Sequence, residues 1–378
     1  MNFHRIYAIT DRRTAGLDDH AEIAQRLFTV GVRLLQVRDK EISDRALLAA
    51  VERVAARAST FRASVLVNDR ADLARLAGVG VHLGEEDLPP AFARRLLAPG
   101  VLLGLSTHDA EAAHRAFEEG IADYVAFGPV FESPTKGIRP ARGLEELARA
   151  AAGKRRPLVA IGGITPRCLD AVFDAGADAA AMIGGLLAEG RIEENARQAL
   201  DIARRRDLAG RVYLVGFMGS GKTAIGRRIA ERLGVAFVDL DAEIERTSGR
   251  TIRALFESSG EAAFRQRESA FLEGTVSLPR AIVATGGGCY AQEENRRTIG
   301  RLGTAVFLDV PFATLLARLA GKTDRPLFQT PDQARRLAAE REPFYRMAPI
   351  HVQLEGESVD ESADRVLSAL DEFRGIAL

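Results

Sequence analysis

Residues 211–223 read RVYLVGFMGSGKT, an apolar run followed by glycines, a lysine and a threonine. The spacing GxxxxGK(S/T) extends from Gly216 to Thr223, and a helical pattern follows at 224–233. Glycines let the N–H groups of such a loop point at phosphate oxygens, and the start of the helix adds positive partial charge. We therefore expect a strand, a loop that binds the phosphates of ATP, and a helix. The residues expected to contact ATP in this loop are Gly219, Ser220, Gly221, Lys222 and Thr223.

Apolar strands and amphipathic helices continue to alternate after this loop. Further strand candidates lie at 236–240, 281–285, 304–310 and 350–354. Together with 211–217 they predict a five-stranded parallel sheet with helices on both faces, the fold of a P-loop kinase domain.

The first part of the chain repeats the same unit more often. Apolar runs occur at 5–10, 33–39, 64–69, 80–84, 102–107, 124–130, 158–163 and 179–184. Eight strand–helix units in about 200 residues match the smallest closed (β/α)8 barrel, or TIM barrel. The charged segment 203–210 ends in glycine before the next strand, as linkers between domains often do. We predict a barrel over 1–207 and a P-loop domain over 208–378.

The composition is that of a globular protein. Hydrophobic residues make up 47% and charged residues 28% of the 378 residues, which argues against a disordered or membrane-embedded chain. Basic and acidic residues each number 52, so no net positive field exists to hold nucleic acid or a membrane surface. The two cysteines suggest neither a disulfide framework nor a zinc site, and no leader sequence is seen. We expect a cytoplasmic protein that acts on small molecules, and the sequence carries no signal for its oligomeric state.

Two carboxylates follow the second strand of the P-loop domain, in the sequence VDLD at 238–241. Asp239 would bind Mg²⁺, and Asp241, one residue further into the cleft, would accept a hydrogen bond from an attacking hydroxyl. The competing interpretation is a helix N-cap, but a cap needs only one carboxylate.

Three further segments of this domain carry chemistry. FRQRE occupies 264–268 in a helical stretch, and the glycines of ATGGGC at 284–289 either admit a ligand closely or form a flexible turn. Residues 321–327, GKTDRPL, are either a lid over the nucleotide or a plain surface loop.

The motifs GFMGSGKT, VDLDAEIE, FRQRE, ATGGG, DRPLF and REPFY, in this order, resemble those of shikimate kinases across 211–355. The resemblance implies phosphorylation of the 3-hydroxyl of shikimate by MgATP, giving 3-phosphoshikimate and ADP; a different small hydroxy acid is the alternative acceptor. It implies catalytic roles for Lys222, Asp241 and Arg325, ATP contacts by Arg318 and Arg325, and Mg²⁺ ligation by Thr223 and Asp239. The residues implied to bind shikimate are Asp241, Arg265, Gly286, Gly287, Gly288 and Arg341.

Polar side chains also gather at the ends of the predicted barrel strands. Arg38 and Lys40 follow the second strand on the same side as Gln36, and Asp69 and Asp87 follow the next two strands. Two carboxylates could converge on Mg²⁺, and a metal with two cations can bind pyrophosphate. Alternatively, the two aspartates cap the helices that follow them.

Glycine pairs end the last two predicted barrel strands, at 162–163 and 184–185. Barrels of this kind commonly bind phosphate at these loops. The loop SPTKG at 133–137 adds hydroxyl groups and a cation. We therefore expect a second phosphorylated ligand.

The motifs QVRDK, VND, GVHLGEED, GLSTH, FGPVFESPTKG and AIGGI resemble thiamine-phosphate synthase across roughly 5 to 200. The resemblance implies that hydroxymethylpyrimidine pyrophosphate is joined to thiazole phosphate, giving thiamine phosphate and pyrophosphate. Mg²⁺ would be held by Asp69 and Asp87. The implied ligands of the pyrimidine pyrophosphate are Gln36, Arg38, Lys40, Asn68, Ser106 and Lys136, and those of the thiazole phosphate are Ser133, Thr135, Gly163 and Gly184.

One position departs from this pattern, because a serine is usual where this chain has Gly184. A related barrel, the thiazole tautomerase, lacks the metal carboxylates and tends to have a histidine at the position of Gly128, which favours the synthase. A tautomerase-like or non-catalytic barrel attached to a working kinase is the alternative. We interpret His82 and His108 as structural residues.

Overall fold

The computed structural model describes residues 4–132, 140–208, 210–319 and 330–373. These residues form two compact units, which divide between Ala203 and Arg204. The expected linker at 203–210 is in part helical, because helix α10 (Ile192–Asp207) continues to Asp207. Arginines in its last turn favour this extension, since cations interact well with the negative end of a helix dipole.

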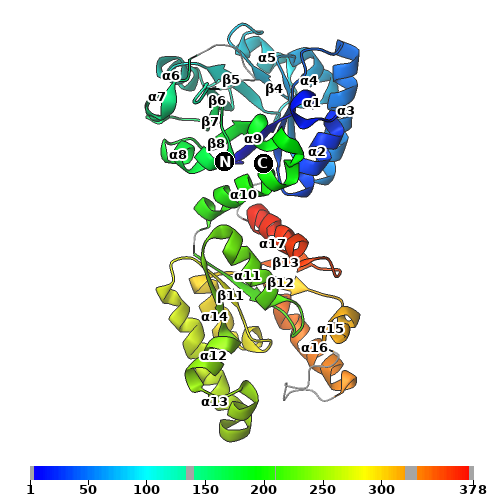
Figure 1. The fold of residues 1–378 in the computed structure, drawn as a ribbon, viewed down its shortest axis with the longest axis vertical. Coiled ribbons are helices and arrows are strands. Elements are labelled where there is room, and N and C mark those ends of the chain that lie inside the picture. The colour runs from blue at the N-terminus through cyan, green and yellow to red at the C-terminus, as the bar shows by residue number, and fades with distance from the viewer. Residues whose placement is uncertain (1–3, 133–139, 209, 320–329, 374–378) are drawn as a thin grey trace. The chain divides into compact units, whose positions relative to one another are not determined.

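The first unit is a closed barrel of eight parallel strands, as predicted (Figure 1). Strand β1 pairs with both β2 and β8, which closes the ring. The strands are β1 (Ile6–Ile9), β2 (Leu34–Val37), β3 (Ser64–Asn68), β4 (Gly80–Leu83), β5 (Leu103–Thr107), β6 (Tyr124–Phe127), β7 (Leu158–Ile161) and β8 (Ala179–Met182).

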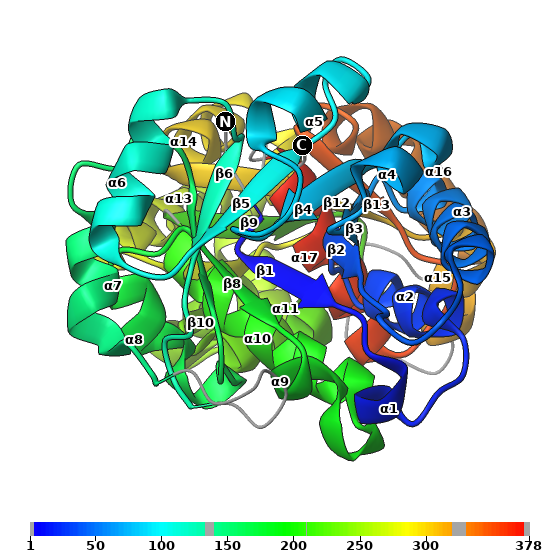
Figure 2. The same ribbon diagram turned by 90° about the horizontal axis from the view of Figure 1, so that it is seen from above.

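Helices surround the barrel on its outside, as Figure 2 shows. They are α1 (Arg12–Ala15), α2 (His20–Thr29), α3 (Asp44–Thr60), α4 (Ala71–Ala77), α5 (Pro90–Leu96), α6 (Ala110–Glu119), α7 (Gly143–Ala151), α8 (Leu169–Asp174), α9 (Gly184–Leu187) and α10. Short 3₁₀ helices lie at Pro166–Cys168 and Ala188–Gly190.

The barrel has two apolar layers because successive strand residues point to opposite sides. Outward-pointing residues such as Ala8 and Leu35 pack with the helices. Inward-pointing residues such as Tyr7, Leu34 and Tyr124 fill the interior. The interior is therefore a packed core on which a site at the strand ends can rest.

The second unit contains a parallel sheet of five strands in the order β10-β11-β9-β12-β13. The strands are β9 (Arg211–Val215), β10 (Ala236–Asp239), β11 (Ala281–Ala284), β12 (Gly303–Asp309) and β13 (Ile350–Gln353). The chain leaves β9 in one direction and later returns past it in the other. Because crossovers between parallel strands are right-handed, this reversal puts helices on both faces, as predicted. The loop after β9 lies at the switch point, where open sheets bind ligands.

The helices of this unit are α11 (Lys222–Leu233), α12 (Leu240–Ser248), α13 (Ile252–Gly274), α14 (Glu293–Leu302), α15 (Phe312–Leu319), α16 (Pro331–Tyr345) and α17 (Val359–Phe373). Short 3₁₀ helices lie at Thr275–Ser277 and Cys289–Ala291. Helix α11 packs against α17, and α13 packs against α14. Among the described residues of both units, no helix is long and apolar enough to cross a membrane.

Candidate active sites

The glycine-rich loop joins β9 to α11 and wraps around the side chain of Lys222. Gly216, Gly219 and Gly221 have φ angles of 142°, 83° and 91°, which suit glycine. The Lys222 ammonium donates hydrogen bonds to the carbonyls of Gly216 and Phe217, both at 2.8 Å. The loop therefore concentrates N–H groups and one buried cation at the start of a 12-residue helix, as a phosphate site requires.

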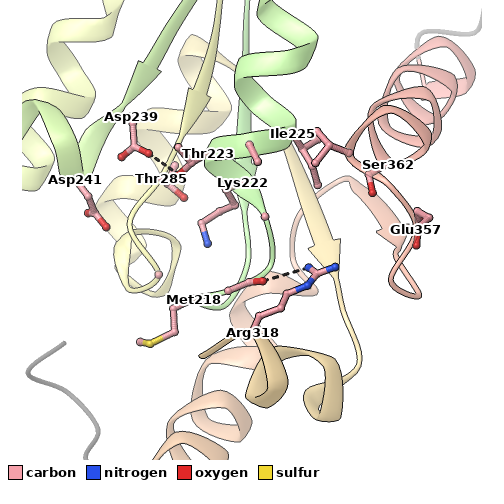
Figure 3. A pocket seen from close by; sticks show the side chains of 15 residues that line it. Met218, Lys222, Thr223, Ile225, Asp239, Asp241, Thr285, Arg318, Glu357 and Ser362 are labelled. Carbon is pink, nitrogen blue, oxygen red and sulfur yellow. Dashed lines mark hydrogen bonds between the residues drawn. The ribbon is translucent and has the colours of Figure 1, made fainter. Parts of the chain in front are cut away.

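Thr223 and Asp239 meet across this loop. The Thr223 hydroxyl donates to Asp239 Oδ2 at 2.6 Å, as the dashed line in Figure 3 indicates. The other oxygen of Asp239 accepts the Ala242 N–H at 3.2 Å and caps helix α12. Asp239 thus caps the helix with one oxygen and faces Thr223 with the other, so the two interpretations of this aspartate are compatible.

A cavity of about 560 Å³ opens beside the loop. Lys222, Thr223, Asp239 and Asp241 line it, and so does Arg318, which donates to the Gly219 carbonyl at 3.3 Å. Its far side is formed by residues that the sequence did not single out, because they follow β13 in a segment of ordinary composition. These are Val359 and two residues labelled in Figure 3, Glu357 and Ser362.

A second cavity of about 460 Å³ adjoins the first. The two cavities share Met218, Asp241 and Gly287. Arg265 and Arg341 line the second cavity, so the structure brings both predicted guanidinium groups together with Asp241.

Two of the three glycines, Gly286 and Gly288, lie against polar side chains at distances that leave no room for a Cβ atom. A Cβ atom at Gly288 would lie 2.3 Å from Arg265 Nη2. A Cβ atom at Gly286 would lie 2.6 Å from Asp241 Oδ1 and 2.5 Å from Glu268 Oε1. These glycines therefore let Arg265, Asp241 and Glu268 lie against the backbone. This favours close approach to the backbone over a merely flexible turn.

The barrel carries a third cavity, of about 470 Å³, at the carboxyl ends of its strands. The predicted residues that line it are Arg38, Lys40, Asn68, Asp69, Asp87 and Ser106. Three other predicted residues that the structure describes do not line this cavity: Gln36, Gly163 and Gly184. Gln36 is only 2% exposed. Four predicted residues fall outside the described residues: Ser133, Thr135 and Lys136 of the barrel, and Arg325 of the other unit.

Asp69 and Asp87 face each other at the edge of this cavity. Burial and the neighbouring Asp69 carboxylate raise the pKa of Asp87, although the Gly84 N–H and Lys40 oppose the shift. Lys40 Nζ lies 3.1 Å from Asp69 Oδ2. Neither aspartate caps a helix, since the N-caps of α4 and α5 are Arg70 and Pro89.

Two converging carboxylates beside a cation suit Mg²⁺. In the parts of the chain that the structure describes, no group of three or more His, Cys, Asp and Glu side chains could hold a metal. Mg²⁺ usually takes one or two carboxylates and completes its shell with water and substrate phosphates. The donor pairs at Asp69 with Asp87, and at Thr223 with Asp239, therefore fit this ion.

Comparison with known proteins matches the two units to different families. A model of thiamine monophosphate synthase matches residues 6–186, and a model of shikimate kinase matches 218–371. A shikimate kinase of Ruegeria pomeroyi is 40% identical over 184 residues, which are 48% of this chain and 94% of the relative. One from Persephonella marina is 38% identical over 160 residues, 42% of this chain and 98% of the relative.

A thiamine-phosphate synthase of Anaeromyxobacter dehalogenans is 51% identical over 159 residues, which are 42% of this chain and 71% of the relative. The chain belongs to both families. The synthase barrel comes first and the shikimate kinase domain second, as the sequence motifs indicated.

Glu268 belongs to the FRQRE segment of the kinase domain, but the sequence pattern assigns it no role. It is fully buried and accepts a hydrogen bond from Arg265 Nη1 at 2.8 Å. Burial raises the pKa of Glu268, and Arg265 opposes the shift. Its signal was its spacing, because a carboxylate three residues after an arginine lies on the same face of a helix.

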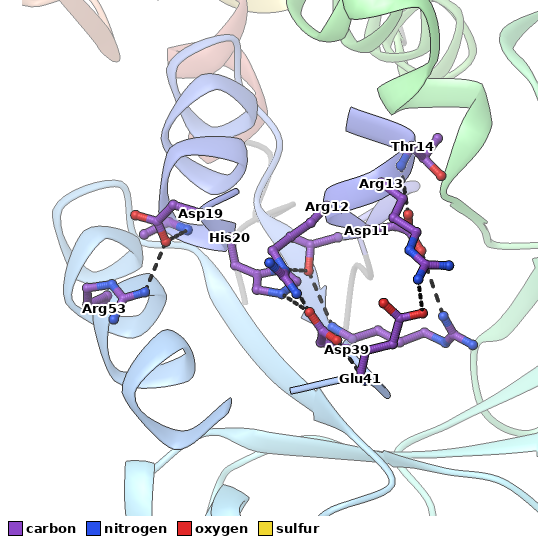
Figure 4. A network of polar contacts seen from close by, with 12 residues as sticks. Asp11, Arg12, Arg13, Thr14, Asp19, His20, Asp39, Glu41 and Arg53 are labelled. Carbon is purple, nitrogen blue, oxygen red and sulfur yellow. Dashed lines mark hydrogen bonds and ion pairs between the residues drawn. The ribbon is translucent and has the colours of Figure 1, made fainter. Parts of the chain in front are cut away.

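A cluster of Thr10, Arg12, His20 and Asp39 holds the loop that carries Arg38 and Lys40. Figure 4 labels Arg12, His20 and Asp39 of this cluster. Asp39 Oδ2 lies 2.7 Å from Arg12 Nε and 3.1 Å from His20 Nε2. The Arg38 N–H donates to Thr10 Oγ1 at 3.3 Å. Asp39 thus anchors the loop through Arg12 and His20, while its neighbours Arg38 and Lys40 line the cavity.

The charge state of this cluster is set by its contacts. Burial alone would raise the pKa of Asp39, but hydrogen bonds from the Glu41 N–H, Arg12 and His20 outweigh it and lower the pKa to about 2. Burial also lowers the pKa of His20, against the effect of Asp39. The cluster is therefore an ion pair of Arg12 and Asp39 with a neutral histidine at pH 7.

Two histidines that we interpreted as structural line the barrel cavity. His82 Nε2 lies 2.8 Å from Ser106 Oγ, and His108 Nδ1 lies 2.6 Å from the Gly128 carbonyl oxygen. At Gly128 a Cβ atom would lie 2.1 Å from the carbonyl oxygen of Ile161. The backbone packing therefore excludes a histidine at this position, which separates the barrel from the tautomerase pattern.

Proposed function

We propose that the chain is a bifunctional enzyme whose second domain transfers a phosphoryl group from ATP to the 3-hydroxyl of shikimate. The observation that carries this proposal is that Asp241 lies where the two cavities of that domain meet. A carboxylate at this junction can accept a hydrogen bond from the acceptor hydroxyl and point its oxygen toward the phosphoryl donor.

The remaining residues divide between the two cavities by charge and geometry. Lys222 would neutralise phosphate oxygens, with Arg318 at the side of the nucleotide cavity. Arg265 and Arg341 would hold the substrate carboxylate, since guanidinium groups bind carboxylates with two parallel hydrogen bonds. Arg325, in the predicted lid, would stabilise charge on the transferring group.

Thr223 and Asp239 would hold Mg²⁺ in the kinase domain, and Asp69 and Asp87 would hold it in the barrel. A bound Mg²⁺ supplies positive charge that neutralises phosphate oxygens. Thr223 presents its hydroxyl and Asp239 a carboxylate oxygen 2.6 Å from it, so both donors already face one point.

We propose that the barrel joins hydroxymethylpyrimidine pyrophosphate to thiazole phosphate. Support comes from one cavity that gathers Arg38, Lys40, Asp69 and Asp87 around a polar pocket. The cations would stabilise the pyrophosphate as it leaves, and the thiazole nitrogen would then attack the pyrimidine methylene carbon. No side chain of the protein needs to act as a nucleophile. Asn68 and Ser106 would contact the pyrimidine substrate, as would Lys136.

The thiazole phosphate would be held by Gly163 and Gly184, with Ser133 and Thr135. A cytoplasmic location remains a prediction from the sequence. The comparisons and the packing of Gly128 offer no support for the tautomerase-like or non-catalytic alternative.

The kinase proposal is tested on the full chain by measuring ADP release with MgATP and a panel of hydroxy acids. Shikimate should be the preferred acceptor. The Arg341→Ala substitution should raise KM for shikimate by about tenfold or more and leave KM for ATP nearly unchanged, because Arg341 lines the second cavity and not the first. Equal losses for both ligands would contradict the carboxylate role.

The synthase proposal is tested by incubating both thiamine precursors with Mg²⁺ and detecting thiamine phosphate. No product from the wild-type chain would refute it. The Asp87→Asn substitution should lower this activity by about 10²-fold and leave the kinase activity unchanged. Because Asp87 has a raised pKa beside Asp69, the same substitution should stabilise the barrel in the absence of Mg²⁺.

A further inference from the structure

Five polar side chains form a series of hydrogen bonds through the interior of the barrel. In order they are Gln36, Tyr7, Tyr124, His82 and Ser106. Gln36 Nε2 lies 2.8 Å from the Tyr7 hydroxyl, which lies 2.9 Å from the Tyr124 hydroxyl. The Tyr124 hydroxyl lies 2.8 Å from His82 Nδ1, and His82 Nε2 lies 2.8 Å from Ser106 Oγ. The series therefore connects the buried core with the cavity.

The barrel packing accommodates this series specifically. A Cβ atom at Gly104 would lie 2.1 Å from the ring of Tyr124 and 2.6 Å from His82 Nδ1, so only glycine leaves room for both rings. Tyr7 and Tyr124 are at most 1% exposed. Burial raises the pKa of both phenols, with smaller opposing effects at Tyr7 from its hydrogen bonds. Each tyrosine therefore keeps its single proton.

Gln36, the first member of the series, sets the direction in which its hydrogen bonds are donated. An amide nitrogen can only donate, so Gln36 donates to Tyr7. If the series continues in this direction, the Tyr7 hydroxyl donates to the Tyr124 oxygen and the Tyr124 hydroxyl donates to His82 Nδ1. In this direction Nδ1 accepts, and Nε2 carries the imidazole proton and donates to Ser106 Oγ.

We propose that this series holds Ser106 as a hydrogen-bond donor into the cavity, so that the barrel selects a ring with an acceptor atom at that point. His82, Tyr124 and Tyr7 are positioning residues in this scheme, and Ser106 makes the contact. Given the synthase function proposed above, the acceptor is a ring nitrogen of the pyrimidine. The exocyclic amino group, which donates, cannot accept the Ser106 proton.

The direction is tested first by the tautomer of His82. In the full-length chain labelled with ¹⁵N-histidine, without substrate and at about pH 8, Nε2 should show one-bond coupling to hydrogen and Nδ1 should not. The His82→Gln variant identifies the signal among the six histidines. Hydrogen on Nδ1 would reverse the series and overturn the proposal. This measurement uses no substrate, so it remains informative even if the synthase function is wrong.

A substitution at a distance from Ser106 distinguishes an effect of hydrogen-bond direction from an effect of packing. Tyr7 is hydrogen-bonded to Gln36 and Tyr124 and not to His82 or Ser106, yet Tyr7→Phe should turn the single His82 tautomer into a mixture. It should also raise KM for the pyrimidine substrate by several-fold, while KM for the thiazole phosphate stays unchanged. Ile9→Val removes a methylene group from the same strand and interior and should change neither quantity. An unchanged tautomer in Tyr7→Phe would contradict the proposal.

The contact itself is tested with pyrimidine analogues in which each ring nitrogen is replaced in turn by C–H. Ser106→Ala should weaken binding of the natural substrate by about tenfold. For one analogue the substitution should cause no further loss, because the acceptor is already absent. Equal losses for all analogues would mean that Ser106 does not donate to a ring nitrogen.

Discussion

The phosphate loop of the kinase domain and the mouth of the synthase barrel both hold phosphorylated ligands in our proposal, but they are built differently. Residues 216–223 form the loop as one continuous stretch, and its backbone N–H groups and one lysine make the site. The barrel cavity is lined by single side chains from the ends of β2, β3, β4 and β5. Residues outside the lining, such as Arg12 and Asp39, hold one of these strand ends in place. A contiguous site should depend on a few local residues, whereas a distributed site should also depend on residues that touch no ligand.

The largest effect should come from removing the central cation of the contiguous site. Lys222→Ala should lower kcat/KM of the kinase by about 10³-fold, because the loop then lacks its charge opposite the phosphates. Thiamine phosphate formation by the same protein serves as the internal control and should be unchanged. A loss of both activities would mean that the two sites are not independent.

The close approaches around the triple glycine provide a second test. Gly288→Ala should raise KM for shikimate by about tenfold or more, because the new Cβ would displace the Arg265 guanidinium. Gly300→Ala in helix α14 is the control, since Gly300 lines neither cavity and its Cβ would meet no atom within 4 Å. Steady-state kinetics with both substrates would check this. Similar KM values in the two variants would argue against close packing on Arg265.

The contacts of Asp39 with Arg12 and His20 should make the stability of the barrel depend on pH. Because the folded-state pKa of Asp39 is lowered to about 2, its contribution to stability is present above its unfolded pKa of about 4 and disappears as the pH falls toward 2. Asp39→Asn should therefore weaken protection of β1 and β2 amides from hydrogen exchange at pH 7, and the difference from wild type should shrink below about pH 4. Asp18→Asn, which changes an exposed carboxylate between α1 and α2, should show no such difference.

The smallest effect should come from restoring a serine at the position where the family usually has one. A Cβ atom at Gly184 meets no atom within 4 Å, so Gly184→Ser should fold normally. It should lower KM for the thiazole phosphate by about two- to tenfold through one added hydrogen bond. Gly185→Ser is the control that should fail to fold well, since its Cβ would lie 2.3 Å from the Ile164 carbonyl oxygen. An unchanged KM would mean that backbone N–H groups already satisfy this phosphate.

Much of both sites could be predicted because parallel strands place their carboxyl ends at one edge. The sequence therefore brought Asp239 and Asp241 to the P-loop, and Arg38, Asp69 and Asp87 to one barrel mouth. Gln36 was expected at the ligand, but it is buried and bonded to Tyr7. Strand periodicity gives the side on which a residue lies and not its depth below the cavity. Ser362 and Val359 gave no signal, since neither belongs to a motif and only folding brings them to the nucleotide cavity.

The loop at 216–223 was fixed by its own residues, because a glycine-rich turn before a helix needs only local backbone geometry to present N–H groups to phosphate. Strand periodicity likewise predicted the two folds, and the ordered motifs indicated the two families. Tertiary structure decided which residues support those sites: the ion pair of Arg12 with Asp39, the pair of Arg265 with Glu268, and the series from Gln36 to Ser106. Their direction and charge depend on burial and on contacts between distant segments, which no local pattern contains.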